Sequence, residues 1–231
     1  MIIPPEQMRQ RLILAADDFG ANYLANQNIL KLIGAKKIDR VAVLINGSLT
    51  EDEIKSFKQS GVKIDLHLSA AKKITETKAV APRLAVFLSR LLASKAISET
   101  TEHAWQEQII KFKILFGRYP DGLNSHQHIH FFPPYFKIAL RLCEKFQIPY
   151  LRFGAKGILK LKSIVSKILI LLWLKDRNSF NKSSIDSSDF LVSWDWVKNK
   201  EGFLQILPAG RCELIFHPER NDEAEFLQKN F

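Results

Sequence analysis

Short apolar runs alternate with longer segments of helical periodicity along the whole chain, and this alternation restricts the fold more than any other sequence feature. It is typical of a chain that builds a parallel sheet from β/α units. The strand candidates are residues 12–15, 40–45, 62–66, 122–124, 150–153, 190–192 and 213–216. The helix candidates are residues 22–34, 51–59, 82–94, 101–116, 134–146 and 159–174, and residues 175–189 are predicted to form a loop. At 231 residues the chain fits one domain, so we predict a single α/β domain over residues 1–231.

The net charge of +10 is the unusual feature of the composition. Hydrophobic residues make up 46% and charged residues 25%, as in ordinary globular proteins. A positive charge of this size is compatible with a nucleic acid, an anionic membrane surface or an anionic substrate, and also with a merely lysine-rich solvated surface. No motif for DNA or RNA recognition accompanies the charge, so we expect no nucleic-acid partner.

Several features bear on where the protein works. Cys143 and Cys212 are far apart and lie in or beside apolar stretches, so we expect free thiols in a reducing cytoplasm. Residues 1–11 lack a signal pattern, and the most apolar segment, 164–174, is shorter than the roughly 20 residues that span a bilayer. We therefore expect a cytoplasmic protein without a transmembrane segment. Residues 156–175 mix lysines with an apolar face, which indicates either a core helix with a lysine rim or a helix in peripheral contact with lipid.

Unusual polar residues fall at or just after the ends of the strand candidates. They are Asp17, Asp18, Asn46, His67, His126, Arg152 and His217. In a parallel β/α barrel the carboxyl ends of all strands open onto one face, where active sites form. Seven such residues over six strand ends are hard to attribute to chance, so we predict that they meet in one site.

The adjacent carboxylates Asp17 and Asp18 directly follow the first strand candidate. Neighbouring side chains on an extended backbone point to opposite sides. One carboxylate can therefore ligate a metal while the other addresses a water beside it, provided that the chain bends at the strand end. The alternative is a helix N-cap, which explains one aspartate more readily than a pair.

Histidines supply the other expected ligands. His67 alone, within an apolar strand, would more often be a hydrogen-bonded core histidine. The cluster His126, His128 and His130 alternates in sequence, and in an extended segment it would place three imidazoles on one side. Such clustering suits metal binding or proton transfer. We expect one ligand, His126, with supporting or substrate-contacting roles for His128 and His130.

Two histidines, one carboxylate and open positions make a hydrolytic metal site rather than a closed structural one. His217 ends the last strand candidate, just before Pro218. It is a candidate general acid, and its alternative is a surface histidine in a turn.

The stretches LILAADDFGAN, AVLINGS, DLHLS, NSHQHIHFFPPYF and LIFHPE occur in one order between Leu12 and Pro218. Together they resemble the YdjC-like carbohydrate deacetylases, which include chitooligosaccharide and hopanoid-associated deacetylases. The resemblance implies a distorted (β/α) TIM-like barrel of the polysaccharide-deacetylase kind. It also implies metal ligands at Asp18, His67 and His126, a base at Asp17 and a leaving-group acid at His217. Family members are reported as magnesium-dependent, whereas two histidine ligands by themselves favour Zn²⁺ over Mg²⁺.

The chain departs from the family pattern in three places. Asn124-Ser125-His126 stands where the family often has Asp-Ser-His, which removes a carboxylate beside the metal. Residues 69–82 lack the Gly- and Pro-bearing loop that many members place near the sugar, and the chain ends at Phe231, earlier than most relatives. These departures bear on the substrate, for which we expect contacts from Asn46, His128, His130 and Arg152.

The sequence thus predicts an enzyme with Mg²⁺ or Zn²⁺ that removes the acetyl group from an N-acetylated amino sugar or oligosaccharide. The first alternative is a metal-dependent phosphoesterase or other hydrolase of an anionic sugar or lipid-linked substrate. The second is a binding module that keeps the fold without the chemistry. The acetylated amino sugar is the expected partner, and a homodimer remains an open alternative.

Overall fold

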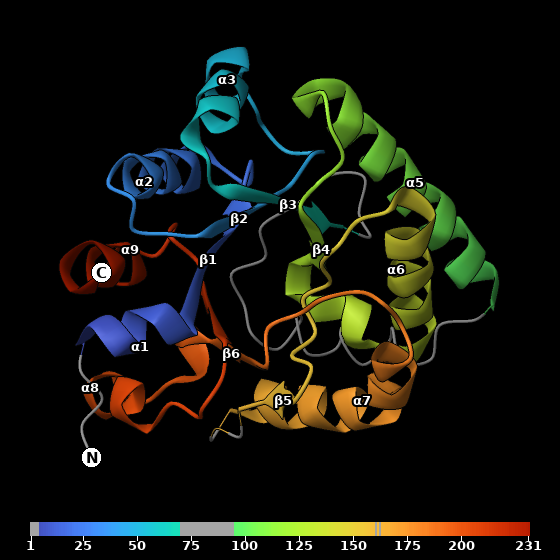
Figure 1. The fold of residues 1–231 in the computed structure, drawn as a ribbon. Helices are drawn as coiled ribbons and strands as arrows, with labels where there is room; N and C mark the ends of the chain where they lie inside the picture. Colours follow the sequence, from blue (N-terminus) through green and yellow to red (C-terminus); the bar gives the residue numbers. More distant parts are fainter. Residues whose placement is uncertain (1–4, 70–94, 160, 162) are drawn as a thin grey trace.

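The computed structural model describes residues 5–69, 95–159, 161 and 163–231. Its centre is a seven-stranded parallel sheet in the order β4-β3-β2-β1-β7-β6-β5. Figure 1 shows the helices on the outside of the strands, with α2 and α3 on one side and α5, α6 and α7 on another. The arrangement confirms the predicted α/β fold with a parallel sheet.

The strands run close to their predicted positions. They are β1 (Leu12–Phe19), β2 (Arg40–Val43), β3 (Lys63–Leu68), β4 (Gly122–Ser125), β5 (Gly157–Ile158), β6 (Phe190–Ser193) and β7 (Cys212–Phe216). Nearly every residue in them is buried, as expected for a parallel sheet that is covered on both faces.

The α-helices are α1 (Pro5–Arg11), α2 (Tyr23–Gly34), α3 (Glu51–Ser60), α5 (Lys95–Phe116), α6 (Pro133–Phe146), α7 (Ile164–Asn181), α8 (Lys200–Phe203) and α9 (Asn221–Asn230). Short 3-10 helices are η1 (His126–Phe131), η2 (Trp194–Trp196) and η3 (Leu204–Ile206). Local sequence explains several boundaries. Thr50 and Glu53 form a capping box at the start of α3, and prolines occupy the first turn of α6.

The sheet curls, and its two edges are linked through residues 150–152. Leu151 bridges to Leu123 on β4, and Tyr150 bridges to Asp186, which lies four residues before β6. The predicted strand at 150–153 therefore exists only as isolated bridges. Together with the curl, these bridges give the sheet a barrel-like interior.

Two further predictions about elements are wrong, and one lies outside the described residues. The predicted helix 159–174 begins later, at Ile164, and runs to Asn181, so it takes up part of the predicted loop 175–189. Leu169, Trp173 and Phe180 fall on one buried stripe that continues past residue 174, and this stripe extends the helix. The helix predicted at 82–94 lies outside the described residues.

Candidate metal centre

The end of β1 bends sharply at Asp18. Its backbone has φ 68°, a left-handed conformation that aspartate tolerates better than most residues. The chain then turns through Gly20, and the loop after β2 approaches it closely. A Cβ on Gly47 would lie 2.0 Å from the carbonyl oxygen of Gly20, so only glycine fits there. The bend sends Asp17 and Asp18 to different partners, as the sequence predicted.

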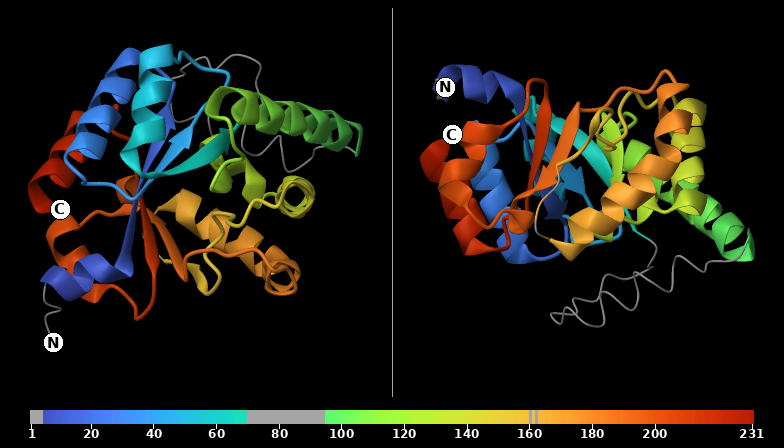
Figure 2. Two further views of the ribbon diagram at one scale, coloured as in Figure 1. Left: turned by 45° about the horizontal axis from the view of Figure 1, so that its top comes forward. Right: turned by 90° about the horizontal axis from the view of Figure 1, so that it is seen from below.

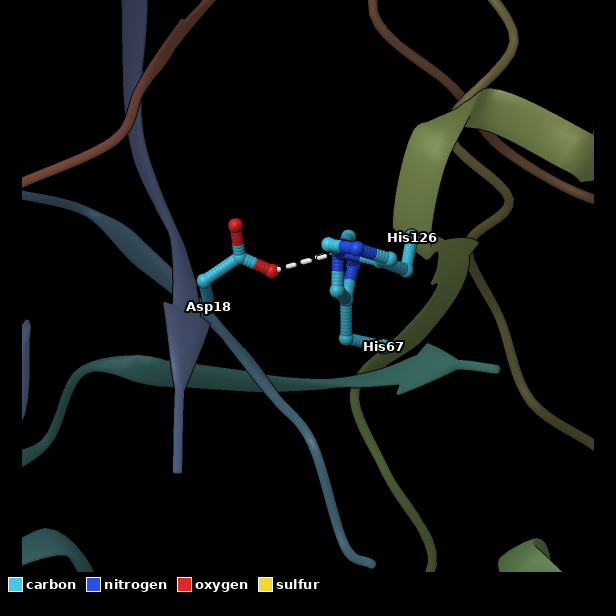
Figure 3. A group of neighbouring side chains, drawn as sticks. All are labelled: Asp18, His67 and His126. Atoms are coloured by element: carbon cyan, nitrogen blue, oxygen red, sulfur yellow. Dashed lines mark hydrogen bonds and ion pairs between the residues drawn. The ribbon is translucent and has the colours of Figure 1, made fainter. Parts of the chain in front are cut away.

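Three predicted ligands converge at the carboxyl ends of β1, β3 and β4 (Figure 3). One ligand atom from each of Asp18, His67 and His126 lies within 4.8 Å of the other two. Asp18 Oδ1 is 2.9 Å from His126 Nδ1 and 3.3 Å from His67 Nε2. Ligands that share one tetrahedral zinc ion at about 2.0–2.2 Å lie about 3.3–3.5 Å apart, so small adjustments would let this group hold an ion.

Asn124 on β4 orients the ring of His67. Its side-chain oxygen is hydrogen-bonded to Nδ1 of His67, which leaves Nε2 facing Asp18. An amide oxygen accepts a proton from Nδ1 and thereby favours the tautomer whose Nε2 lone pair can bind a metal. Asn124 thus performs the orienting role that the sequence comparison assigned to a carboxylate, although it adds no negative charge. Its Nδ2 is buried and has no hydrogen-bond partner among the described residues.

Electrostatics at the same point favour a cation. Burial alone would lower the pKa of His67, but the carboxylates of Asp17 and Asp18 raise it. Burial would likewise raise the pKa of Asp18, but His126 and His67 hold it well below its usual range. The site therefore attracts positive charge where the carboxylate and the imidazoles meet, which is where a metal ion would lie.

The buried ionic groups around this point carry an excess of negative charge. Five carboxylates, two guanidiniums and the protonated imidazole of His217 are involved, and together they leave two negative charges: Asp17, Asp18, Asp65, Glu213 and Glu223 against Arg40, Arg152 and His217. One divalent cation would balance this excess, which a buried cluster needs because unpaired charge is costly in the interior. The donor set and the charge both fit a divalent metal.

Asp17 is held by Arg152. The guanidinium donates from Nη1 to Asp17 Oδ2 at 2.7 Å and from Nη2 to Oδ1 at 2.8 Å. Burial would raise the pKa of Asp17, but Arg152 outweighs it and lowers the pKa to about 2. Asp17 Oδ2 is also 4.0 Å from His67 Nε2, so an ionised carboxylate with a fixed orientation lies directly beside the candidate ligands.

His217 follows β7 and is largely enclosed. Its backbone N–H donates to Glu223 Oε2, and its Nδ1 lies 3.8 Å from the same oxygen. Burial would lower the pKa of His217, but Glu223, Asp18 and Asp17 together raise it to about 10. The imidazole is therefore protonated at neutral pH in the absence of a metal, which is the state that a general acid requires.

The prediction that His126, His128 and His130 form an extended segment with three imidazoles on one side is wrong. These residues lie in η1, where Gln127 and His128 have φ 55° and 53°. The tight turn sends the three rings in different directions, so only His126 joins Asp18 and His67.

His130 has a structural role. It is fully buried, with Nδ1 bonded to Ser125 Oγ at 2.6 Å and Nε2 bonded to the Arg152 carbonyl at 2.7 Å. The expectation of a substrate contact does not hold for a ring whose two nitrogens are both used within the protein. His128 instead lies beside the site. Its ring is 5.5 Å from that of Trp196, its Nδ1 has no partner among the described residues, and burial with the charge of Arg152 lowers its pKa to about 3.

The other two expected substrate contacts also change. Arg152 is fully buried and bonded to Asp17 and Glu213, so it positions other groups and does not face a ligand. Asn46 lies on the surface and accepts a hydrogen bond from Lys111 Nζ at 3.3 Å. No hydrogen bond or ion pair of the described residues joins Asn46 to the candidate ligands.

Sequence reasoning missed the groups that support the site from below. Glu213 on β7 accepts from Arg152 Nε at 2.6 Å and from the Tyr150 hydroxyl at 2.6 Å. Because Tyr150 and Arg152 lie beside β4, these bonds cross the inside of the curled sheet to reach β7. The available signal was a charged residue within an otherwise apolar strand, since such residues are almost never buried unless paired.

A cavity of about 530 Å³ lies beside the site and not at the three candidate ligands. Trp196, which contacts His128, forms part of its wall. Leu161, Val197 and Phe203 also line it, so its surface is mainly apolar. Trp196 therefore separates an apolar hollow from the polar residues around His128.

Fold and geometry together define an α/β protein with a candidate divalent-metal centre at the carboxyl edge of a curled parallel sheet. The chain belongs to the YdjC-like protein family, whose sequence model matches residues 11–230. This membership confirms the resemblance seen in the sequence.

Individual relatives are distant. The mouse (Mus musculus) protein named carbohydrate deacetylase is 23% identical over 160 residues, which cover 64% of this chain and 52% of that protein. Its human (Homo sapiens) namesake is 24% identical over 156 residues, which cover 62% and 48%. The chain thus spans about half the length of these curated relatives.

A solved structure supports the fold. The match is a protein of Enterococcus faecalis V583 proposed to cleave cellobiose phosphate, with a TM-score of 0.58 and 22% sequence identity. The match covers 89% of this chain and 80% of that one. At this identity the likeness concerns the fold alone.

Proposed function

We propose that this chain is a metal-dependent deacetylase that removes the acetyl group from an N-acetylated amino sugar or oligosaccharide. The observation that carries the proposal is the convergence of Asp18, His67 and His126 beside an ionised Asp17. Membership of the YdjC-like family and the names of the two curated relatives supply the substrate class. The proposal includes a single domain of the polysaccharide-deacetylase kind.

The candidate ligands would hold either Zn²⁺ or Mg²⁺. A divalent cation there would supply Lewis acidity toward a carbonyl oxygen and acidify water at neutral pH. Two imidazoles and one carboxylate are a donor set that suits zinc better than magnesium, which prefers oxygen ligands. The proposal therefore ranks Zn²⁺ first.

Asp17 and His217 would move the protons. Water oxygen adds to the acetyl carbonyl carbon while Asp17 accepts the proton that the water loses. The carbon–nitrogen bond then breaks as His217 donates its proton to the departing amine, and the products are acetate and a free amino sugar. Arg152 keeps Asp17 ionised and oriented, and the carboxylate of Glu223 favours the protonated form of His217.

The test is a substrate panel. Metal-depleted protein resupplied with Zn²⁺ or Mg²⁺ is incubated with N-acetylated mono- and oligosaccharides and, in parallel, with phosphate esters. We expect acetate release that requires the metal and falls by about 10²–10⁴-fold in Asp17→Asn, with metal binding retained. The exposed residue His103 gives a matched control, since His103→Ala removes only a surface contact with Glu107. Phosphate release without acetate release would contradict the proposal.

A further inference from the structure

Helix α7 exposes an unusual number of large apolar side chains. Four of the eight large hydrophobic residues exposed in the described part of the chain lie on it, namely Ile164 (66%), Val165 (38%), Leu171 (67%) and Leu174 (46%). The opposite face of the helix is already occupied, because Leu169, Trp173 and Phe180 are buried. Figure 2 shows α7 on the outside of the molecule, beside α6. The exposed apolar side chains of α7 are therefore separate from the side chains that pack into the core.

The charges on the outer face of α7 are all positive. Lys167, Lys175 and Arg177 are exposed, whereas the helix's one carboxylate, Asp176, is buried with 3% exposure. Lys167 and Lys175 fall at helical spacing with Leu171, four residues on either side of it. Lysine stems can lie along an apolar surface while their ammonium groups reach polar surroundings. The outer face of α7 thus carries both exposed apolar side chains and exposed cations.

We propose that the outer face of α7 docks on the surface of a bilayer that contains anionic lipids. Apolar side chains that enter the acyl boundary, with lysines at the headgroups, are the pattern of a helix lying in a membrane interface. The chain's net charge of +10 favours the same partner. None of the described helices combines the length and hydropathy that crossing a bilayer requires, so the contact is peripheral.

Two other occupants fit the face less well. A second copy of the chain in a two-fold contact would set Lys167, Lys175 and Arg177 of one copy near those of the other, and no carboxylate on this face would offset them. A nucleic acid would use the cations but would leave Leu171 and Ile164 in water. An anionic bilayer uses both kinds of side chain.

The apolar cavity lies at the same end of the molecule as the start of α7. Leu161, which lines the cavity, precedes the first residue of α7 by three positions. Docking through Ile164 would therefore bring the cavity close to the bilayer surface. Docking on lipid does not depend on the proposed catalytic activity, so a binding measurement alone can test it.

The test is sedimentation of the full chain with vesicles of phosphatidylcholine alone or with about 30% phosphatidylglycerol. We expect binding to the anionic vesicles and much weaker binding to the neutral ones. Leu171→Glu should lower the partition constant about tenfold or more, because it removes an apolar group that docking would bury in the bilayer and adds repulsion from the anionic lipids. Ile114→Glu is the matched control. Ile114 on α5 is 75% exposed, so it gives the same charge change at another site, and we expect binding to stay unchanged.

A second variant and its control test the charges. The double variant Lys167→Gln/Lys175→Gln should weaken binding to anionic vesicles several-fold and leave the weak binding to neutral vesicles unaltered. Lys31→Gln, at an exposed lysine of α2, is the control. The proposal is overturned if the wild type does not sediment with anionic vesicles at low salt, or if Leu171→Glu and Ile114→Glu behave alike. It is also overturned if the chain is a dimer in solution that Leu171→Glu converts to a monomer.

Discussion

Two layers of charge lie inside the curled sheet, and they differ in the groups that face their carboxylates. The upper layer, at the carboxyl ends of the strands, consists of Asp18, His67 and His126. The lower layer consists of buried ion pairs: Arg152 with Asp17 and Glu213, and Arg40 with Asp65. In the lower layer every carboxylate has a guanidinium, whereas the carboxylate of the upper layer faces two imidazoles.

The lower layer is bonded in detail. Arg40 donates from Nε to Asp65 at 2.8 Å, and its guanidinium lies 3.9 Å from the centre of the Tyr150 ring. Gly122 leaves room for this contact, since a Cβ there would lie 2.6 Å from the Arg40 guanidinium. Buried carboxylates thus serve two purposes in this protein. Carboxylates that bond to a guanidinium support the fold, and the carboxylate that faces only imidazoles is left to bind a cation.

Removing one ligand of the upper layer separates the roles of the two layers most clearly. His126→Ala should lower deacetylase activity by about a thousandfold or more, because the Lewis acidity of the metal is worth several kcal/mol in the transition state. In the presence of a chelator its free energy of unfolding should change by less than about 1 kcal/mol, since His126 is partly exposed and supports little packing. Acetate release and urea unfolding measure the two effects. A large loss of stability without metal would mean that the upper layer is structural as well.

His217 gives the next largest effect. His217→Asn should lower the rate of amide hydrolysis by about 10²–10⁴-fold, because the amine leaves without a proton donor. The activity of this variant on an activated aryl acetate, whose leaving group needs no proton, should fall much less. Equal losses of activity on both substrates would mean that His217 is not the general acid.

The pH dependence of His217 can be measured on metal-free protein. Its pKa rises from 6.5 in the unfolded chain to about 10 in the folded protein. The stability that its charged form contributes is thus fully present below pH 6.5 and is lost as the pH rises toward 10. His217→Asn should show a flatter decline of unfolding free energy over this window, and an unchanged slope would contradict the assignment.

Arg152→Met tests the lower layer. It leaves Asp17 and Glu213 buried without their cation, which should cost about 3–5 kcal/mol of unfolding free energy. Arg118→Met is the matched control, because Arg118 pairs with Asp121 at the surface and should cost at most about 1 kcal/mol. Urea unfolding of both variants without metal measures the two losses. Equal losses of unfolding free energy would show that the buried ion pairs of the lower layer stabilise the fold no more than a surface pair does.

Asn124→Ala gives the smallest of these effects. Loss of the oxygen that fixes the His67 tautomer should weaken metal affinity by about 10–100-fold. Asn124→Asp should restore or strengthen binding, since a carboxylate accepts from the same nitrogen. Metal titration of the three proteins measures this, and unchanged affinity in Asn124→Ala would mean that another contact orients His67.

Local sequence predicted the upper layer well and the lower layer poorly. Asp18, His67 and His126 stand out because each follows an apolar run, and parallel strands must end on one side of the sheet. Glu213 gave no comparable signal, because its partners Tyr150 and Arg152 lie 63 and 61 residues away in the chain and meet it across the interior. Pairings at that separation depend on how the sheet curls, which short-range periodicity does not encode.

The segment after β4 shows a second limit. Alternating histidines indicate an extended chain, but Gln127 and His128 adopt left-handed backbone conformations, and the turn separates His126 from His130. Nothing local marks those two residues, since neither is glycine. Helix α7 shows a third limit, because its buried stripe continues to Phe180 through polar residues that suggested a loop.

Asp18, His67 and His126 should together hold one divalent ion, which can be counted by measuring metal content after reconstitution with Zn²⁺. We expect one zinc ion per chain in the wild type and in His103→Ala, and almost none in Asp18→Asn or His67→Ala when all four proteins are folded. Full occupancy in Asp18→Asn and His67→Ala, or none in the folded wild type, would contradict the account.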